Sequence, residues 1–352
     1  HSLAYTLVWS NFFSKLLPWG GMYLISFLSI LIITFIITQK NKKELLFIFI
    51  LFLSSFQFLI SNKKIEYLNN IKVYFFTTQF DSTGLKNENK ILRYETAKEI
   101  FNKHKTTNKE LYNSDIIIFP ENTYFIDQDP KIKNLILEEF KDSVFLDSGK
   151  FNGEYLLTYF KNNQLEFYRK QMLLPQSEYV SYWMKYFAVI FNQKQWVNSF
   201  ERERWSKRGE ESYVYKTDYL NGELDSEIKI GGLLCYEIIS PLFYRQQVES
   251  GANILVNLAS HGIFPNSRTL LNQTISIAKV RAIENNKFLI QVTNKNSSFV
   301  ISNKGDVIFV SNPDEISGNN ITVPLIEEKT FYTKFGDLVT LFSFWFIFSV
   351  FL

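Results

Sequence analysis

The sequence predicts a layered α/β domain flanked by membrane-spanning helices. Two observations carry this prediction. The middle of the 352-residue chain alternates apolar runs of strand length with helix-length segments, and both ends of the chain carry long apolar runs. Continuous apolar strands are typical of sheets that are covered on both faces. We therefore expect sheets inside the domain and helices outside.

Three apolar segments predict membrane helices, at residues 19–39, 45–61 and 337–352. The first has no charged residue over about 20 positions, the length needed to cross the hydrocarbon core of a bilayer. A buried core helix is the alternative for each segment. The first segment does not resemble a signal peptide, because a second apolar run follows it directly and no small-residue cleavage site separates the two.

The connection Lys40–Glu44 predicts the orientation in the membrane. It carries three lysines in a short loop, which favours the cytoplasmic side. Residues 1–18 then form an extracytoplasmic loop or interfacial segment, and the middle region also lies outside the cytoplasm. Two lysines after the second span weaken this asymmetry. The chain begins without methionine and ends within an apolar run, so we expect a fragment that lacks material at both ends.

Composition argues against several classes of function. The formal net charge of +3 is too small to favour nucleic-acid binding. The three histidines, at positions 1, 104 and 261, are too scattered to predict a metal site. The lone cysteine, Cys235, cannot form an intramolecular disulfide, so its role is either packing or chemistry.

The middle region of the chain has the character of a water-soluble domain and contains the predicted strands and helices. The predicted strands are Ile71–Phe76, Ile116–Phe119, Ser143–Leu146, Glu154–Phe160, Leu165–Arg169, Ile230–Cys235, Ile254–Leu258, Phe288–Val292, Phe299–Ser302 and Val307–Val310. The predicted helices are Asn89–Lys105, Pro130–Lys141, Pro241–Ser250 and Leu270–Glu284. The stretch Tyr182–Lys216 is rich in tryptophan and charge, and predicts either a lid at the membrane interface or an ordinary surface excursion.

Three strand ends carry the residues that point to chemistry. Glu121 lies just past the end of one predicted apolar strand, and Lys170 and Cys235 each stand at the end of another. Each has an ordinary explanation when taken alone: a helix cap or solvated carboxylate, a snorkelling lysine, and a packed cysteine. Their type, order and spacing taken together are much more specific than any one of them.

This combination of Glu, Lys and Cys resembles the nitrilase superfamily. The flanking segments resemble one of its membrane-anchored families, the apolipoprotein N-acyltransferases, from about Trp9 to the end of the chain. The segments that carry the resemblance are Pro175–Val180, Cys235–Glu237, Ala278–Glu284 and Phe331–Asp337. The resemblance implies a nitrilase-like αββα sandwich over residues 71–327, flanked by transmembrane helices. It also implies that earlier membrane helices are missing from this chain.

The resemblance implies acyl transfer through a thioester, with three catalytic residues. Cys235 would attack an ester carbonyl as a thiolate, and Glu121 would be the general base. Lys170 would lower the pKa of the thiol and stabilise the developing oxyanion, together with the backbone N–H after the cysteine. The supporting residues that the resemblance implies are Glu178, Glu237 and Tyr236.

The implied acyl donor is a membrane phospholipid, and the implied acceptor is the N-terminal amine of diacylglyceryl-cysteine in an apolipoprotein. No metal, organic cofactor or nucleic acid is expected. The implied setting is a monomeric, multi-pass protein of the bacterial inner membrane, with its catalytic domain outside the cytoplasm. Two alternatives remain: a membrane-anchored amidase or hydrolase that uses the same triad, and an inactive paralogue that binds lipids or lipoproteins.

Two loops depart from the family pattern. His261 stands where the family has Asn, Phe264 stands near an expected Trp, and Asn294 is followed by Lys295 where Gly is common. These loops shape the pocket wall in the family, so His261, Phe264 and Asn294 are predicted wall residues. His261 is either a polar wall residue or an additional acid/base group, and the departures bear on the acyl acceptor.

Overall fold

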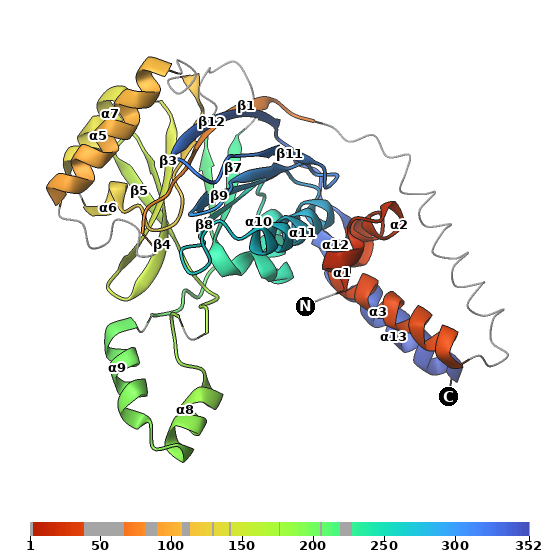
Figure 1. Cartoon of the computed structure of the whole chain (residues 1–352). Helices are drawn as coiled ribbons and strands as arrows, with labels where there is room; N and C mark the ends of the chain where they lie inside the picture. Colours follow the sequence, from red (N-terminus) through yellow and green to blue (C-terminus); the bar gives the residue numbers. More distant parts are fainter. Residues whose placement is uncertain are drawn as a thin grey trace.

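Two six-stranded sheets stack face to face, and helices cover their outer faces (Figure 1). The computed structural model describes residues 3–38, 67–81, 90–107, 113–128, 130–140, 142–175, 177–204, 206–218 and 227–351. The predicted layered α/β arrangement, with sheets inside and helices outside, is confirmed.

The first sheet has the strand order β12-β1-β2-β3-β4-β5. Its central strands β1, β2 and β3 run parallel, and the other strands join them in antiparallel pairs. The bounds are β1 (Asn70–Thr77), β2 (Ile116–Ile118), β3 (Val144–Phe151), β4 (Glu154–Lys161), β5 (Gln164–Arg169) and β12 (Ser317–Pro324).

The second sheet has the order β11-β10-β9-β8-β7-β6, and β7, β8 and β9 run parallel. The bounds are β6 (Val214–Thr217), β7 (Ile228–Leu234), β8 (Ile254–Ser260), β9 (Leu289–Asn294), β10 (Phe299–Ile301) and β11 (Val307–Val310). Residues that follow β7 and β8 therefore meet at one edge of this sheet. The ten predicted strands are present, whereas β6 and β12 were not predicted.

Apolar side chains from both sheets form the central core. Val73, Phe75 and Ile230 are among the residues with no exposed surface in this cluster. The sheets approach closely at Gly232, where a Cβ atom would collide with the Tyr159 hydroxyl. These short strands are buried on both faces. This burial explains why their sequences are continuous apolar runs and do not alternate between apolar and polar residues, as the strands of a half-exposed sheet do.

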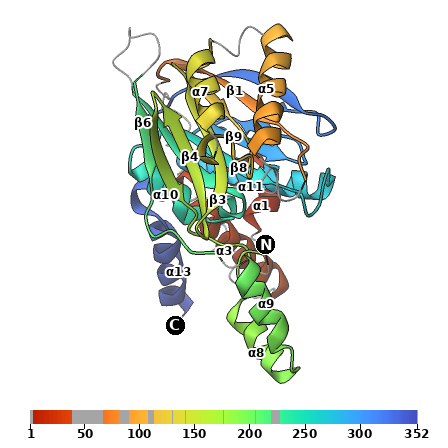
Figure 2. The same cartoon turned by 90° about the vertical axis from the view of Figure 1, so that its left-hand side faces the viewer.

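Helices cover the outer faces as predicted (Figures 1 and 2). The first sheet is covered by α5 (Lys90–Thr107) and α7 (Pro130–Glu139), with the short α6 (Phe125–Gln128) beside them. The second sheet is covered by α10 (Pro241–Glu249) and α11 (Arg268–Asn285). Phenylalanines at 76, 101, 119, 140 and 145 fill the layer between the first sheet and its helices.

Two apolar helices lie side by side and extend away from the sheets (Figure 1). They are α3 (Leu17–Thr38) and α13 (Leu338–Phe351), and Thr340 donates a hydrogen bond across them to the carbonyl of Gly20 at 3.2 Å. Among the described residues, α3 alone is long and apolar enough to cross a membrane, with a mean hydropathy of 1.7 over Leu17–Thr34. The predicted span 45–61 lies outside the described residues.

A buried polar cluster joins α3 to the α/β domain. Arg281 and Glu284 of α11 are fully buried and form an ion pair. Arg281 Nη2 donates to the Tyr5 hydroxyl at 3.0 Å and lies 2.9 Å from the sulfur of Met22. The backbone of Met22 is hydrogen-bonded to Glu284, next to a kink at Gly21, where φ is +63°. The contacts fix the start of α3, together with α1 (Ala4–Leu7), against α11.

The stretch Tyr182–Lys216 begins as a helical hairpin that projects from the domain (Figures 1 and 2). Its helices are α8 (Tyr182–Ile190) and α9 (Lys194–Arg204), linked by an ion pair between Lys185 and Glu201. The exposed side chains of α8 are largely aromatic, and Trp183 is 68% exposed. The hairpin lies on the side of the domain toward which α3 and α13 also extend.

Candidate active site

Glu121 bridges the edges of the two sheets. It follows β2 and is only 4% exposed. Its Oε2 accepts a hydrogen bond from the backbone N–H of Ser260, the last residue of β8, at 3.0 Å. Its Oε1 lies 3.5 Å from Nζ of Lys170, which follows β5. The carboxylate is therefore a buried, partnered group rather than the solvated residue that an isolated Glu would suggest.

Lys170 is also buried, with 1% of its surface exposed. Its Nζ donates to Oε1 of Glu178 at 2.6 Å and lies 5.0 Å from the centre of the Tyr155 ring. Its backbone N–H donates to the Tyr155 carbonyl at 2.9 Å. A buried ammonium group with two carboxylate neighbours is a fixed positive charge, so the snorkelling alternative is wrong.

Cys235 occupies a strained turn between β7 and a short 3₁₀-helix, η2 (Cys235–Ile239). Its φ angle is +50°, a conformation that costs a non-glycine residue about 1 kcal/mol and is concentrated at functional sites. The side chain of Asn257 donates to the Cys235 carbonyl at 3.3 Å. This turn directs the thiol to the Glu121 carboxylate, to which it is hydrogen-bonded.

Glu178 closes the loop after Lys170. While Oε1 accepts from the lysine, Oε2 accepts from the backbone N–H of Leu174 at 2.8 Å. The backbone N–H of Glu178 returns a hydrogen bond to the Leu174 carbonyl at 2.9 Å. With both oxygens occupied and only 5% of its surface exposed, Glu178 orients Lys170.

Glu237 ties the end of β7 to the loop after β5. Its Oε1 accepts from the Tyr168 hydroxyl at 2.8 Å and from the N–H groups of Gln171 and Met172 at 2.6 Å and 3.0 Å. Its Oε2 accepts from the N–H of Leu234 at 2.9 Å. The carboxylate has no exposed surface, and it fixes the backbone just after Lys170 and just before Cys235.

The three charges set the protonation state of the site. Burial raises the pKa of Cys235, as do Glu121 and Glu178, and Lys170 lowers it only in part. Burial also raises the pKa of Glu121, against the opposing effect of Lys170. Burial lowers the pKa of Lys170, but the two carboxylates outweigh burial and raise it well above its ordinary value. The expected lowering of the thiol pKa by Lys170 is therefore outweighed, and the resting thiol is protonated beside the Glu121 carboxyl group.

His261 lies just beyond the Ser260 contact. It is 9% exposed, its backbone N–H donates to the Asn294 carbonyl at 2.9 Å, and its Nδ1 has no hydrogen-bond partner among the described residues. Burial lowers the pKa of His261 to about 4, so the imidazole is neutral at pH 7. The backbone N–H of Phe264 donates to the His261 carbonyl at 2.9 Å, and the Phe264 side chain is 64% exposed.

Asn294 is fully buried and holds neighbouring backbone and side-chain groups in place. Its Oδ1 accepts from the Thr78 hydroxyl at 2.9 Å, and its Nδ2 lies 3.2 Å from the Ser260 hydroxyl. The next residue, Lys295, has φ of +63°, a region that glycine adopts most readily. The turn requires a left-handed backbone conformation at this position, which explains why glycine is suited to it.

Sequence reasoning missed four residues that support the site: Tyr155, Tyr168, Asn257 and Ser260. Tyr155 acts through its ring face and Tyr168 through its hydroxyl. Asn257 acts through its side-chain amide and Ser260 through its backbone N–H. No local pattern marks such residues, because strand pairing and sheet stacking create the contacts. Tyr236, predicted as a supporting residue, lies half-buried beside Cys235.

The chain matches a known class of enzymes. The carbon-nitrogen hydrolase family matches residues 93–323, more than half of the chain. The chain belongs to the carbon-nitrogen hydrolase family.

The chain is similar to several curated proteins named apolipoprotein N-acyltransferase. The protein of Shewanella oneidensis is 25% identical over 259 residues, covering 67% of this chain and 47% of its own length. That of Prochlorococcus marinus is 36% identical over 104 residues, covering 30% and 21%. Apolipoprotein N-acyltransferase 2 of Treponema denticola is 25% identical over 305 residues, covering 83% and 56%. The chain thus spans about half, or less, of each relative.

Solved structures share the fold. Saccharomyces cerevisiae Nit3, a member of branch 10 of the nitrilase superfamily, has a TM-score of 0.50 and 16% identity, covering 75% of this chain and 92% of that protein. An amidase from Nesterenkonia sp. has a TM-score of 0.50 and 11% identity, covering 80% and 99%. At this identity the likeness concerns the nitrilase-like fold alone.

Proposed function

We propose that the protein is an apolipoprotein N-acyltransferase, which moves an acyl chain from a membrane phospholipid to the N-terminal amine of diacylglyceryl-cysteine. The observation that carries the proposal is the meeting of Glu121, Lys170 and Cys235 in one buried site, each placed there by a different strand end. The relatives named apolipoprotein N-acyltransferase support the choice of reaction.

In the first half-reaction the thiol of Cys235 gives its proton to Glu121, and the sulfur attacks the ester carbonyl carbon of the phospholipid. The buried ammonium of Lys170 and the backbone N–H of Tyr236 stabilise the oxyanion of the tetrahedral intermediate. The ester C–O bond then breaks, and the lysophospholipid alkoxide takes the proton from Glu121. Cys235 is left as a thioester.

In the second half-reaction the neutral amine of diacylglyceryl-cysteine attacks the thioester carbon. The C–S bond breaks as the amide bond forms, and Glu121 takes a proton from the nitrogen and returns it to the sulfur. The site ends in its starting state. The same carboxylate serves both halves because it contacts Cys235 and is held by Ser260 and Lys170.

We infer that α3 and α13 hold this site at the bilayer surface. Ile30, Leu341 and Phe342 are 59%, 65% and 65% exposed, which is suited to contact with lipid. Residues 71–327 would form the catalytic unit on the extracytoplasmic side of a bacterial inner membrane. A membrane location avoids extracting an acyl chain into water, which costs about 0.8 kcal/mol per CH₂.

The test uses the full-length enzyme in membranes with isotope-labelled phospholipid, and intact-mass detection of an acyl adduct on Cys235. An adduct that disappears when diacylated lipopeptide is added, with triacylated product, supports the proposal. An adduct that decays without lipopeptide would instead identify a hydrolase. Absence of any adduct on folded protein would favour a lipid-binding paralogue.

A further inference from the structure

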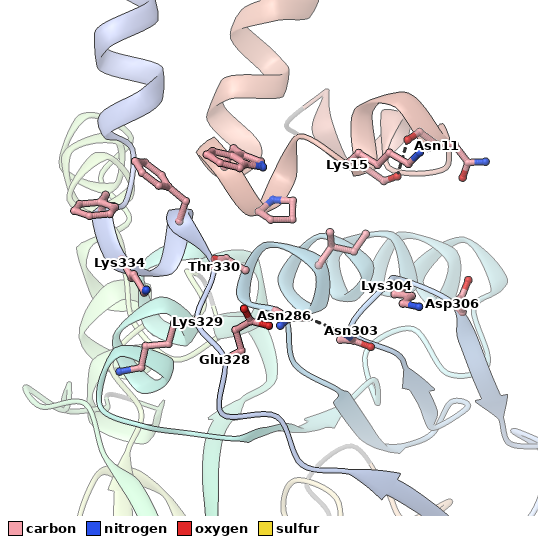
Figure 3. A pocket seen from close by; sticks show the side chains of 16 residues that line it. Asn11, Lys15, Asn286, Asn303, Lys304, Asp306, Glu328, Lys329, Thr330 and Lys334 are labelled. Atoms are coloured by element: carbon pink, nitrogen blue, oxygen red, sulfur yellow. Dashed lines mark hydrogen bonds between the residues drawn. The ribbon is translucent and has the colours of Figure 1, made fainter. Parts of the chain in front are cut away.

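A cavity of about 690 Å³ lies where the α/β domain meets the apolar helices (Figure 3). Its walls come from α2 (Asn11–Ser14), the start of α3, the end of α11, the β10–β11 turn and α12 (Phe331–Phe335). The residues proposed for acyl transfer do not line it.

The cavity is remote from the candidate active site. The loop that contains His261 leads into the N-terminal end of α11, whereas Ile283 and Asn286, at the other end of that helix, line the cavity. With 18 residues at a rise of about 1.5 Å each, α11 is about 27 Å long. The two places are therefore at opposite ends of one rigid helix.

Three exposed lysines from three separate elements surround the cavity. Lys15 follows α2, Lys304 lies in the β10–β11 turn, and Lys334 belongs to α12 (Figure 3). None of the three forms an ion pair with any residue that the structure describes. Separate elements that bring unpaired ammonium groups around one cavity favour an anionic group such as a phosphate.

The remaining charged residues of the wall leave this positive balance intact. Lys329 also lines the cavity and is bound to the carbonyl of Glu249 at 2.7 Å. The carboxylates are those of Asp306 and Glu328, so lysines outnumber carboxylates by four to two. Asp306 accepts a hydrogen bond from the Ser302 hydroxyl at 3.1 Å.

The side of the cavity next to α3 and α13 is aromatic. Trp19 stacks on Phe331 with ring centres 5.4 Å apart, and Phe331 contacts Phe335 at 4.5 Å. Trp and other amphipathic aromatic side chains favour the depth of lipid head groups. From this aromatic layer the exposed apolar faces of α3 and α13 continue away from the domain, which provides a path for acyl chains.

We propose that this cavity binds one anionic phospholipid, with its phosphate among Lys15, Lys304 and Lys334 and its acyl chains along α3 and α13. The bound lipid is not the acyl donor, because it lies at the opposite end of α11 from the candidate active site. It would hold the domain against the bilayer. The inference rests on the membrane placement proposed above.

The test measures lipid retention by native mass spectrometry of the full chain carrying Cys235→Ala. Diether phosphatidylglycerol is the probe, because its ether bonds cannot acylate a nucleophile. We expect one retained lipid, and weaker retention of diether phosphatidylcholine. The triple variant K15Q/K304Q/K334Q should bind the anionic probe about tenfold more weakly or worse.

The matched control is K98Q/K103Q/K131Q, which removes three exposed lysines from α5 and α7 on the far sheet. It should retain the probe as the parent does. Equal retention in both triple variants, equal loss in both, or displacement by equimolar inorganic phosphate would each overturn the proposal.

A second measurement covers the case in which the triple variant unfolds. A photoactivatable diether phosphatidylglycerol should label peptides 11–19 and 328–335 of the folded parent chain, and labelling confined to other segments would overturn the proposal. Neither measurement depends on turnover. Failure here would therefore be distinguishable from failure of the proposed acyl transfer, which the thioester assay tests.

Discussion

Nζ of Lys170 lies 2.6 Å from Oε1 of Glu178, and both side chains are buried. The contact of the lysine with Glu121 is longer, at 3.5 Å. Lys170 is therefore held more closely by Glu178 than by Glu121, which suits Glu121 to the proton exchange with Cys235 proposed above.

Replacement of Glu178 by Gln should lower the rate of thioester formation by about 10- to 100-fold, the equivalent of one charged hydrogen bond. Because the negative charge of Glu178 raises the pKa of Glu121, its removal should also move the acidic limb of the pH–rate profile to lower pH. Glu154→Gln is the matched control, since it removes an exposed ion pair with Arg169. If Glu178→Gln left both the rate of thioester formation and the acidic limb of the pH–rate profile unchanged, the anchoring role of Glu178 would be contradicted.

Cys235→Ala and Cys235→Ser should abolish acyl transfer, with losses of about 10⁴-fold or more, without unfolding the domain. Serine keeps the shape of the turn but is a poorer nucleophile beside the same base. Activity is measured by triacylated product and folding by the thermal unfolding temperature. Near-normal turnover in either variant would exclude a cysteine nucleophile.

Glu237→Gln should lower the free energy of unfolding by about 1–3 kcal/mol, because an amide N–H₂ then faces backbone N–H donors in a buried site. Tyr168→Phe removes a single donor to the same carboxylate and should cost less. Denaturant unfolding of both variants provides the comparison. The reverse order of stability would show that the hydroxyl, rather than the carboxylate, organises this turn.

His261 should make the fold sensitive to acid. Its pKa is about 4 in the folded protein and about 6.5 in an unfolded chain, so between these values the unfolded state binds the extra proton. Above pH 6.5 both states are neutral and there is no effect. As pH falls from 6.5 to 4 the protein should lose up to about 3 kcal/mol, and His261→Gln should remove this loss. Identical acid unfolding of the two proteins would contradict the prediction.

The α8–α9 hairpin should matter for lipid substrates only. Replacing residues 182–204 by a short linker removes the exposed aromatic side chains of α8 but leaves the loop that packs on Lys170 through Gly209. We expect reduced thioester formation from phospholipid vesicles and an unchanged rate with a short, soluble ester. If the variant instead matched the parent chain in its rate with both substrates, the hairpin would not gate lipid access.

The fold was predictable wherever apolar runs mark the core. The strand run Ile254–Leu258 and the helix Leu270–Glu284 are such cases, and the structure has β8 and α11 there. By contrast β12 has little apolar character and owes its strand conformation to pairing with β1 along all eight residues. Similarly β6 is a four-residue edge strand that only its neighbour β7 defines. Pairing of this kind is a tertiary effect.

The candidate site was predictable to the extent that its groups follow strands. Glu121, Lys170 and Cys235 stand at strand ends in the sequence, and the structure brings them together. The protonation state was not predictable, because burial and two neighbouring carboxylates together raise the pKa of the thiol more than one lysine lowers it. The left-handed conformation of Cys235 is likewise a product of the turn between β7 and η2.

Arg281 and Glu284 fasten α11 to the start of α3 inside the domain. Since the other end of α11 continues into the loop that carries His261, a tilt of α3 would be transmitted through this helix to the loop beside the candidate site. The tilt of a spanning helix depends on the thickness of its bilayer. If α3 spans the membrane as proposed, lipid composition would act on the geometry of the candidate site as well as supply its substrate.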